Sequence, residues 1–327
     1  MLVPVLLFIV GFACLIKGGD WFVDGAAGIA KRFNMPEILV GATVVSIGTT
    51  LPEVMVSASS AVMGHGEIAY GNAIGSIICN ASLIAALTIA IRPSDVERKS
   101  LVLPTFFFFT AAVFYSAVAY FAGFFSRITG ILLLLMFIIY MALTIRQAVK
   151  SDEGAVPSDA EGADKSGSKN EPIWKLILLI IVGAALIAVG ADLLVDNGTI
   201  IAEALGVPES VIALTFVALG TSLPELVTAI TSLAKGYGAL SLGNVIGANL
   251  FNLVLVSGIS CTLSPFAVPV GKKIAGIPAS LVVEIPLMLA VMAFVTVPAL
   301  IRGKLARIQG IILLIVYAVF CVFQFIG

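Results

Sequence analysis

Long apolar segments restrict the fold of this chain more than any other feature of its sequence. A helix needs about 20 mainly apolar residues to cross the hydrocarbon core of a bilayer. Charged residues, glycines and prolines divide the sequence into ten segments of that length. We therefore predict an all-α membrane protein of about ten transmembrane helices, with spans at 3–28, 37–63, 67–90, 101–121, 126–147, 173–200, 209–234, 238–262, 277–299 and 306–326.

The scarcity of charge agrees with lipid as the main solvent. Only 11% of the 327 residues are charged, whereas about 25% is usual in a soluble domain. The net charge of -1 and the absence of a basic patch give no reason to expect a nucleic-acid partner. The four cysteines are far apart in apolar runs, so neither a disulfide framework nor a thiolate metal site is indicated.

One polar stretch separates the first five predicted spans from the last five. Within the linker 148–172, the segment 151–172 is rich in Gly, Ser, Asp, Glu and Lys, which is typical of a solvated connection. Cytoplasmic loops of membrane proteins carry an excess of Lys and Arg. That bias places both termini outside and the linker in the cytoplasm. The expected domains are a first five-helix repeat, 1–147, and a second, 173–327, in a multi-pass protein of the cell membrane.

The chain contains an internal repeat. Residues 41–83 align with 213–255 without a gap at a constant offset of 172 residues, and the same register pairs Gly18 with Gly190. Because five spans per repeat is an odd number, the second repeat enters the membrane from the opposite side. Inverted repeats are typical of secondary transporters, which bind their ions near the membrane midplane where the repeats meet.

Each repeat carries the motif G-T-[TS]-L-P-E near the middle of an apolar span, at 48–53 and at 220–225. A proline inside a helix removes a backbone donor and disturbs the preceding turn. We therefore expect Pro52 and Pro224 to interrupt their helices and to release carbonyl oxygens. Hydroxyl groups flank each proline, on Thr49, Thr50, Thr221 and Ser222.

The motifs place one glutamate of each repeat, Glu53 and Glu225, inside the membrane. An unpaired charge there costs about 2.5 kcal/mol or more, and neither motif contains a lysine or arginine. Carboxylate, hydroxyl and carbonyl oxygens suit Ca²⁺ and Na⁺. Two carboxylates balance one Ca²⁺, and the same oxygens could hold Na⁺ instead, so one ion would displace the other. The alternative is a pair of protonated, hydrogen-bonded structural glutamates.

A second motif, G-N-x-[IV]-G-[SA]-x-x-x-N, follows in each repeat at 71–80 and 243–252. Its glycines predict close helix packing. The amide oxygens of Asn80 and Asn252 suit cation coordination, whereas Asn72 and Asn244 are expected to cap or brace the interrupted helix.

At these two motifs the chain resembles the sodium/calcium exchanger family of the cation/calcium antiporters, in its prokaryotic form with two alpha repeats. The resemblance implies alternating access, with the first and sixth helices sliding against the rest. It also implies a cation site in which Glu53 and Glu225 are the central ligands. The remaining ligands that it implies are oxygens of Thr49, Thr50, Thr221 and Ser222, the backbone carbonyls of Ser46 and Ala218, and the side chains of Ser76, Asn80 and Asn252.

Two positions depart from parts of that family. Potassium-dependent members carry Asp at the position of Asn252, which argues against potassium coupling here. Other members carry Ser at the position of Ala248, so one sodium ligand is missing. The long regulatory calcium-binding domains of animal exchangers are absent, because the linker is too short to hold them.

The sequence thus predicts a secondary antiporter that exchanges Ca²⁺ for Na⁺, with no enzymatic activity and no cofactor besides the transported ions. A Ca²⁺/H⁺ antiporter with the same site is the first alternative, although the proton-coupled branch typically has a glutamate after the Gly-Asn pair and this chain has none. A cation channel is a further alternative. An intramembrane metalloprotease would need an H-E-x-x-H ligand set, which the sequence lacks.

Several other polar residues are expected to be solvated and not to serve the site. Lys17 is expected to pair with an aspartate or to extend to the interface. His65, the one histidine, lies in a short external loop without enough neighbours for a metal site. The aspartates near the ends of the first and sixth spans are expected to be interfacial carboxylates: Asp20, Asp24, Asp192 and Asp196.

Overall fold

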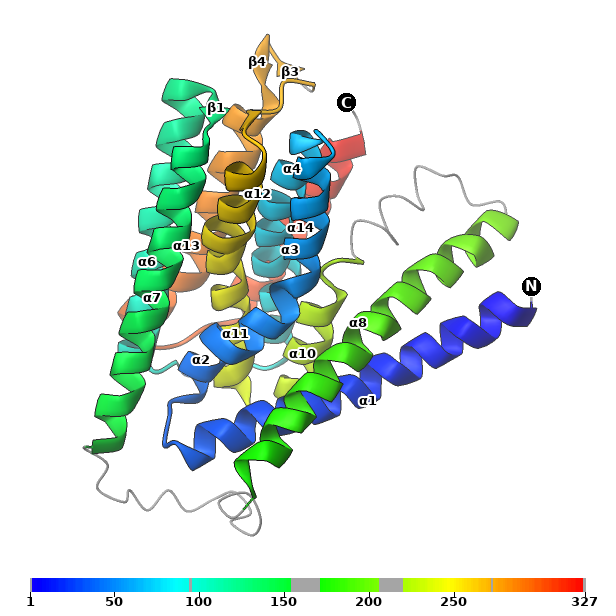
Figure 1. Ribbon diagram of the computed structural model, residues 1–327, viewed down its shortest axis with the longest axis vertical. Coiled ribbons are helices and arrows are strands. Elements are labelled where there is room, and N and C mark those ends of the chain that lie inside the picture. The colour runs from blue at the N-terminus through cyan, green and yellow to red at the C-terminus, as the bar shows by residue number, and fades with distance from the viewer. Residues whose placement is uncertain (1, 94–95, 154–170, 206–219, 272, 326–327) are drawn as a thin grey trace. The chain divides into compact units, whose positions relative to one another are not determined.

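The computed structural model describes residues 2–93, 96–153, 171–205, 220–271 and 273–325 (Figure 1). Within these ranges, nine helices are long and apolar enough to cross a membrane, and one shorter apolar helix accompanies them. Nine of the ten predicted spans are therefore confirmed, with ends that differ by a few residues. The span predicted at 209–234 is described only from residue 220 onward.

The first half of the sequence forms five helical spans. They are α1 (Leu2–Arg32); α2 (Glu37–Val40), η1 (Gly41–Val45) and α3 (Ser46–Val62); α4 (Gly66–Cys79), η2 (Asn80–Ala85) and α5 (Ala86–Ile91); α6 (Arg98–Ala117) and η3 (Val118–Ala122); and α7 (Arg127–Glu153). The segments named η are π-helical turns inside otherwise α-helical spans. Because α7 continues to Glu153, the first residues of the predicted linker are helical, and 154–170 lie outside the described residues.

The second half repeats this order. Its spans are α8 (Ile173–Ala204); α10 (Leu223–Ala234); α11 (Gly238–Phe251), η6 (Asn252–Val256) and α12 (Ser257–Leu263); η7 (Ser280–Glu284) and α13 (Ile285–Arg302); and α14 (Arg307–Phe325). Four short strands lie in the connections. β1 (Phe124–Phe125) pairs antiparallel with β2 (Phe266–Ala267), and β3 (Lys273–Ile274) pairs antiparallel with β4 (Ile277–Pro278).

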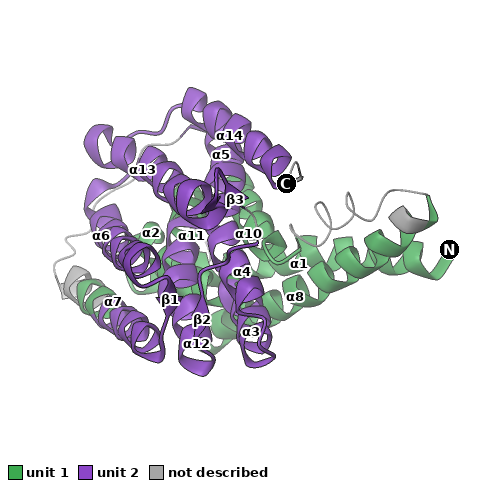
Figure 2. Cartoon of the chain, turned by 90° about the horizontal axis from the view of Figure 1, so that it is seen from above, with its two compact units in different colours: residues 1–49, 143–244 green, residues 50–142, 245–327 purple. Residues whose placement is uncertain are grey.

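The chain divides into two compact units, coloured in Figure 2. Unit 1 contains residues 1–49 and 143–244, and unit 2 contains 50–142 and 245–327. Each unit therefore combines segments from both sequence repeats. Two of the three boundaries fall inside the motifs, within α3 and within α11, and the third falls within α7.

In unit 1, α1 and α8 lie side by side and antiparallel (Figures 1 and 2). Glycines line their contact: a Cβ atom added to Gly11 would lie 2.9 Å from the carbonyl oxygen of Gly190, and one added to Gly18 would lie 2.8 Å from that of Gly183. These backbones approach so closely that a side chain would not fit. Small residues at crossing points are typical of helix pairs in membranes.

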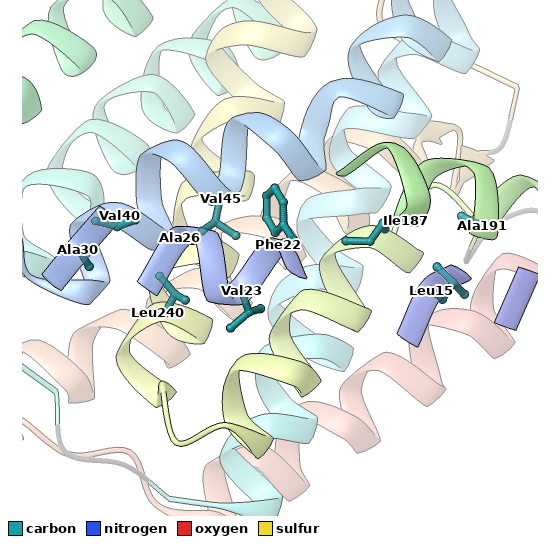
Figure 3. Packing of buried hydrophobic residues seen from close by; sticks show 10 residues of the cluster. All are labelled: Leu15, Phe22, Val23, Ala26, Ala30, Val40, Val45, Ile187, Ala191 and Leu240. Carbon is teal, nitrogen blue, oxygen red and sulfur yellow. The ribbon is translucent and has the colours of Figure 1, made fainter. Parts of the chain in front are cut away.

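Apolar side chains fill the rest of unit 1 around that pair (Figure 3). Phe22, Val23 and Ala26 of α1 are fully buried there, and Ile187 and Ala191 of α8 join the same cluster. The cluster also takes in Val40 and Val45 at either end of η1, and Leu240 of α11. The elements that carry motif residues of unit 1 are thus held against α1 by direct packing.

Unit 2 has its own close contacts. Gly310 of α14 packs against the backbone of α5, where a Cβ atom would lie 2.5 Å from the carbonyl oxygen of Ala86. Four aromatic rings cluster between α4, α6 and the first strand pair, namely Tyr70, Tyr115, Phe125 and Phe266. The Tyr115 and Phe125 rings stack, with 4.3 Å between their centroids.

The prolines of the two motifs do not act alike. Pro52 lies inside the continuous helix α3, so the interruption predicted there is wrong. The irregular backbone of that span is instead the π-helical η1, which ends at Val45 and is separated from the motif by two residues. Pro224 occupies the first turn of α10, after a turn at 220–222. A proline is tolerated in a first turn because the backbone donor that it lacks would have no partner there.

Candidate functional site

Both motif glutamates are completely buried. Glu53 lies in the second turn of α3 and Glu225 in the first turn of α10, each with no exposed surface. Charged side chains are rarely buried in this way unless they are paired or bind a metal. One glutamate belongs to unit 2 and the other to unit 1, so the site is described one unit at a time.

In unit 1 the motif hydroxyls gather around Asn244. The Oδ1 atom of Asn244 accepts a hydrogen bond from the Thr49 hydroxyl at 3.2 Å. The Ser46 hydroxyl lies 3.4 Å from the same Oδ1 atom and 2.7 Å from its nearest acceptor, the carbonyl oxygen of Gly41 in η1. The Ser46 hydroxyl also lies 3.0 Å from the backbone carbonyl oxygen of Asn244. This part of the site therefore has a defined polar wall made by η1, α3 and α11.

The carboxylate of Glu225 lies next to that wall. It interacts with the Thr49 hydroxyl, although neither carboxylate oxygen has a hydrogen-bond partner within 3.5 Å among the described residues. Within the described residues, no lysine or arginine forms an ion pair with it. Glu225 thus presents two buried oxygens that no described hydrogen-bond donor satisfies.

The remaining predicted ligands of unit 1 lie close to Glu225 in sequence. Ser222 immediately precedes α10, and its buried hydroxyl has no hydrogen-bond partner among the described residues. Thr221 is partly buried in the preceding turn. Ala218, predicted to contribute a backbone carbonyl, lies outside the described residues.

In unit 2, Asn72 of α4 binds the helix that carries Glu53. Its Nδ2 atom donates to the backbone carbonyl of Glu53 at 3.2 Å and to the Ser57 hydroxyl at 2.8 Å. The side-chain amides of Asn72 and Asn244 therefore both form hydrogen bonds with protein groups, in agreement with the bracing role predicted for them.

Asn80 and Asn252 differ from that pair. Both side chains are completely buried, and neither their amide oxygens nor their amide nitrogens have a hydrogen-bond partner among the described residues. Each begins a π-helical turn, η2 or η6, at equivalent positions of the two repeats. Such turns are frequent at functional sites. These amides are available to a ligand, whereas those of Asn72 and Asn244 are already engaged.

The other predicted ligands of unit 2 are also buried. Thr50 has a hydroxyl without a hydrogen-bond partner among the described residues, and Ser76 is 5% exposed. Ala248 is completely buried at the repeat position of Ser76. Unit 2 thus buries several uncharged oxygen-bearing side chains in addition to Glu53.

Two hydroxyl residues that contact the site were missed from the sequence. Ser57 binds Asn72, and Thr228 accepts a hydrogen bond from Asn244 Nδ2 at 2.9 Å. Each follows its glutamate by one helical turn, at a spacing of four or three residues, so both lie on the glutamate's face of the helix. The repeat-equivalent positions, Ala229 for Ser57 and Val56 for Thr228, carry no hydroxyl. Comparison of the two repeats therefore did not reveal these residues.

The glycines of the second motif are close to other backbones in one repeat. A Cβ atom on Gly243 would meet the carbonyl of Ile38, and one on Gly41 would meet that of Leu240. The predicted packing role is therefore confirmed for Gly243. At Gly71 and Gly75 no described residue lies within 4 Å of such an atom.

The residues that were expected to be solvated lie away from this chemistry. Asp20 and Asp24 are exposed at 39% and 53% of their side chains, and both pair with Lys235, at 3.4 and 2.7 Å. Lys17 lies over the Trp21 ring instead of pairing with an aspartate. His65 is exposed, and no group of three or more His, Cys, Asp or Glu side chains forms a metal cluster within the described ranges.

Comparison with known proteins agrees with this arrangement. The family model for the sodium/calcium exchanger protein matches residues 3–146 and 175–326. The chain is 34% identical to an uncharacterized membrane protein of Methanocaldococcus jannaschii, over 95% of each chain. It is 30% identical to the sodium/calcium exchanger MaX1 of Methanosarcina acetivorans, over 98% of each chain.

Solved structures give the same result. The fold is similar to that of the sodium-calcium exchanger NCX_Mj soaked with 2.5 mM Na⁺ and 10 mM Sr²⁺, with a TM-score of 0.78 and 32% identity over 97% of each chain. The same exchanger without Na⁺ and Ca²⁺ gives a TM-score of 0.77. On the family match, the relatives and the fold, this chain is a multi-pass membrane transporter that belongs to the sodium/calcium exchanger family.

Proposed function

We propose that the protein exchanges Ca²⁺ for Na⁺ by alternating access, with Glu53 and Glu225 as shared ligands of both ions. One observation carries this proposal: two repeat-equivalent glutamates are completely buried in motifs that contain no lysine or arginine. A buried carboxylate is tolerated when a cation binds it. Two carboxylates match the charge of one Ca²⁺, so the electrostatic balance favours a divalent cation at the centre.

The proposed ligands around the glutamates are uncharged oxygen donors. They comprise the hydroxyls of Thr49, Thr50, Thr221, Ser222 and Ser76, the amide oxygens of Asn80 and Asn252, and the backbone carbonyls of Ser46 and Ala218. Buried amides without partners at Asn80 and Asn252 support this assignment. Hydroxyl, carbonyl and amide oxygens are hard ligands that suit Na⁺ and Ca²⁺ alike, which is what mutual displacement of the two ions requires.

Proton coupling is the second candidate, because buried carboxylates also bind protons readily. We favour sodium coupling because the exchanger from Methanosarcina acetivorans is named for sodium and calcium and because NCX_Mj was soaked with Na⁺, Ca²⁺ and Sr²⁺. We further propose extracellular termini, a cytoplasmic linker at 148–172 between the repeats 1–147 and 173–327, and no cofactor beyond the transported ions.

Flux through reconstituted vesicles tests the proposal. Proteoliposomes loaded with Na⁺ and diluted into Na⁺-free buffer should take up ⁴⁵Ca, and added external Na⁺ should release it. Vesicles loaded with K⁺ at the same ionic strength are the control. Uptake that follows an imposed pH gradient and ignores sodium would establish the proton-coupled alternative, and single-channel currents would establish a pore.

A further inference from the structure

A chain of hydrogen bonds in unit 1 connects the helix of Glu225 to the hydroxyl of Thr49. The Thr228 hydroxyl donates to the backbone carbonyl of Pro224 at 2.8 Å, and the carbonyl of Glu225 lies 3.0 Å from it. The Thr228 oxygen in turn accepts from Asn244 Nδ2 at 2.9 Å. At the far end, Asn244 Oδ1 accepts from the Thr49 hydroxyl at 3.2 Å. The three side chains involved, those of Thr228, Asn244 and Thr49, are at most 2% exposed.

The direction of this chain follows from the hydrogen bond that Thr228 donates to the Pro224 carbonyl and from the number of protons available. A hydroxyl carries one proton, and Thr228 gives its proton to a backbone carbonyl that can only accept. The Thr228 oxygen must therefore accept, so the amide nitrogen of Asn244 faces it. That orientation turns Asn244 Oδ1 toward Thr49, which must then donate. While Thr228 donates to the Pro224 carbonyl, exchange of the amide oxygen and nitrogen of Asn244 would place Oδ1 against a Thr228 oxygen that has no proton left to give.

This polarity matters for a cation next to Glu225. A hydroxyl coordinates a cation through its oxygen lone pairs and must point its proton elsewhere. Thr49 interacts with the Glu225 carboxylate, and two other acceptors compete for its proton, Asn244 Oδ1 at 3.2 Å and the backbone carbonyl of Ser46 at 3.5 Å. Asn244 Oδ1 is the nearer of these two, and when Thr49 donates to it, the lone pairs of Thr49 remain available to an ion held by Glu225.

We propose that Thr228 and Asn244 are positioning residues, which set the direction of the Thr49 hydroxyl and thereby the affinity of the site for cations. The proposal rests on the cation site proposed above. It assigns no ligand role to Thr228 or Asn244, because both side chains bind protein groups.

The first repeat supports the idea independently. There, Asn72 Nδ2 donates to the Ser57 hydroxyl at 2.8 Å and to the carbonyl of Glu53 at 3.2 Å. The repeat equivalent of Thr228 is Val56, which has no hydroxyl, and Ser57 at the next position provides one instead. Both repeats therefore turn the amide nitrogen of this asparagine toward the glutamate helix, although the hydroxyl that receives it comes from a different position.

Close packing places Asn244 where it can act in this way. Gly243 lies against the carbonyl of Ile38, and Gly41 lies against the backbone of Leu240 and Asn244. Because these glycines bring η1 and α11 together, the short asparagine side chain reaches both Ser46 and Thr49. A residue with a Cβ atom at Gly41 or Gly243 would separate the two helices.

Substitution of Thr228 separates the positioning role from a packing role. Thr228→Val keeps the shape and removes the hydroxyl, whereas Thr228→Ser keeps the hydroxyl. We expect Thr228→Val to raise the Ca²⁺ concentration for half-maximal exchange about tenfold, which corresponds to one hydrogen bond at a charged site. Thr228→Ser should remain within about twofold of the unmodified protein by the same scale. The melting temperature without ions should differ little between the two variants.

The decisive test introduces Thr228→Val into a protein that already carries Thr49→Val. If Thr228 acts through the Thr49 hydroxyl, Thr228→Val should change the Ca²⁺ affinity no further once that hydroxyl is gone, as in a double-mutant cycle between coupled residues. Equal affinities of Thr228→Val and Thr228→Ser would overturn the inference, and so would additive effects of Thr49→Val and Thr228→Val. Absence of ⁴⁵Ca exchange by the unmodified protein would instead overturn the proposed function itself.

Discussion

At the scale of single residues, the burial of two acids is the feature with the clearest consequence. Glu53→Gln and Glu225→Gln keep the size of each side chain and remove its charge. We expect each substitution to reduce Ca²⁺ uptake at least about 100-fold, equivalent to about 2.7 kcal/mol, because one carboxylate cannot balance a divalent ion. Uptake of ⁴⁵Ca by proteoliposomes measures this effect.

The same substitutions should not unfold the protein. Removal of a buried charge also removes its desolvation cost, so the melting temperature without ions should stay equal or rise. Glu67→Gln, at an exposed glutamate in the first turn of α4, is the matched control and should transport normally. Full transport by both buried variants would contradict the assigned roles.

Ala248 and Ser76 permit a second test at the residue scale. They occupy equivalent positions of the two repeats, and the first has no hydroxyl. Ser76→Ala should weaken Na⁺ activation of exchange several-fold, on the order of one neutral hydrogen-bonding group. Ala248→Ser should strengthen it by a comparable factor if the added oxygen reaches the ion. The readout is the Na⁺ concentration for half-maximal ⁴⁵Ca release, and changes in the same direction would argue against equivalent roles.

At the scale of elements, the contact between α1 and α8 depends on glycine. A Cβ atom at Gly183 would lie 2.6 Å from the backbone nitrogen of Phe22 and 2.8 Å from the carbonyl oxygen of Gly18. Gly183→Ala should therefore destabilise the protein by about 1–3 kcal/mol through overpacking, even though alanine is the better helix former by about 1 kcal/mol.

Thermal unfolding in detergent measures this loss. Ala13→Val, at an exposed position of α1, is the control, because it adds volume to the same helix pair away from the contact. Its melting temperature should stay near that of the unmodified protein. A Gly183→Ala protein as stable as the unmodified chain would show that the two helices separate without cost.

The spans could be predicted from the sequence because they follow from apolar length and charged punctuation, which need no tertiary information. The π-helical turns could not. A shift in backbone hydrogen-bond register at Asn80 or Asn252 leaves no compositional mark. The effect of proline was also mispredicted: Pro52 is accommodated within α3, whereas Pro224 stands where a helix begins, and position in the helix decides which outcome applies.

The site was predicted as a set of ligands but not as a network. Burial of both glutamates followed from their apolar surroundings. The bonds of Asn72 to Ser57 and of Asn244 to Thr228 depend on which helix faces lie against each other, which no single segment specifies. The sequence therefore identifies the groups that could bind an ion, and the fold determines which of them are already committed to protein partners.

At the scale of the whole molecule, inverted repeats require that equivalent loops face opposite sides of the membrane. His65 follows α3, Ala234 ends α10, and both are exposed within equivalent stretches of the two repeats. The distribution of Lys and Arg predicts that His65 lies outside and Ala234 inside. In right-side-out vesicles, a membrane-impermeant maleimide should modify the His65→Cys protein directly and the Ala234→Cys protein only after permeabilisation.

The unmodified chain is the control for this experiment, because Cys14 and Cys321 are partly exposed and set the background of labelling. The result separates the repeat relationship from the orientation. Exchanged accessibility of the two positions would keep the inverted repeats and reverse the orientation of the whole protein. Modification of both positions from one side would contradict the inversion itself, and with it the argument that two equivalent glutamates approach a common ion from opposite sides.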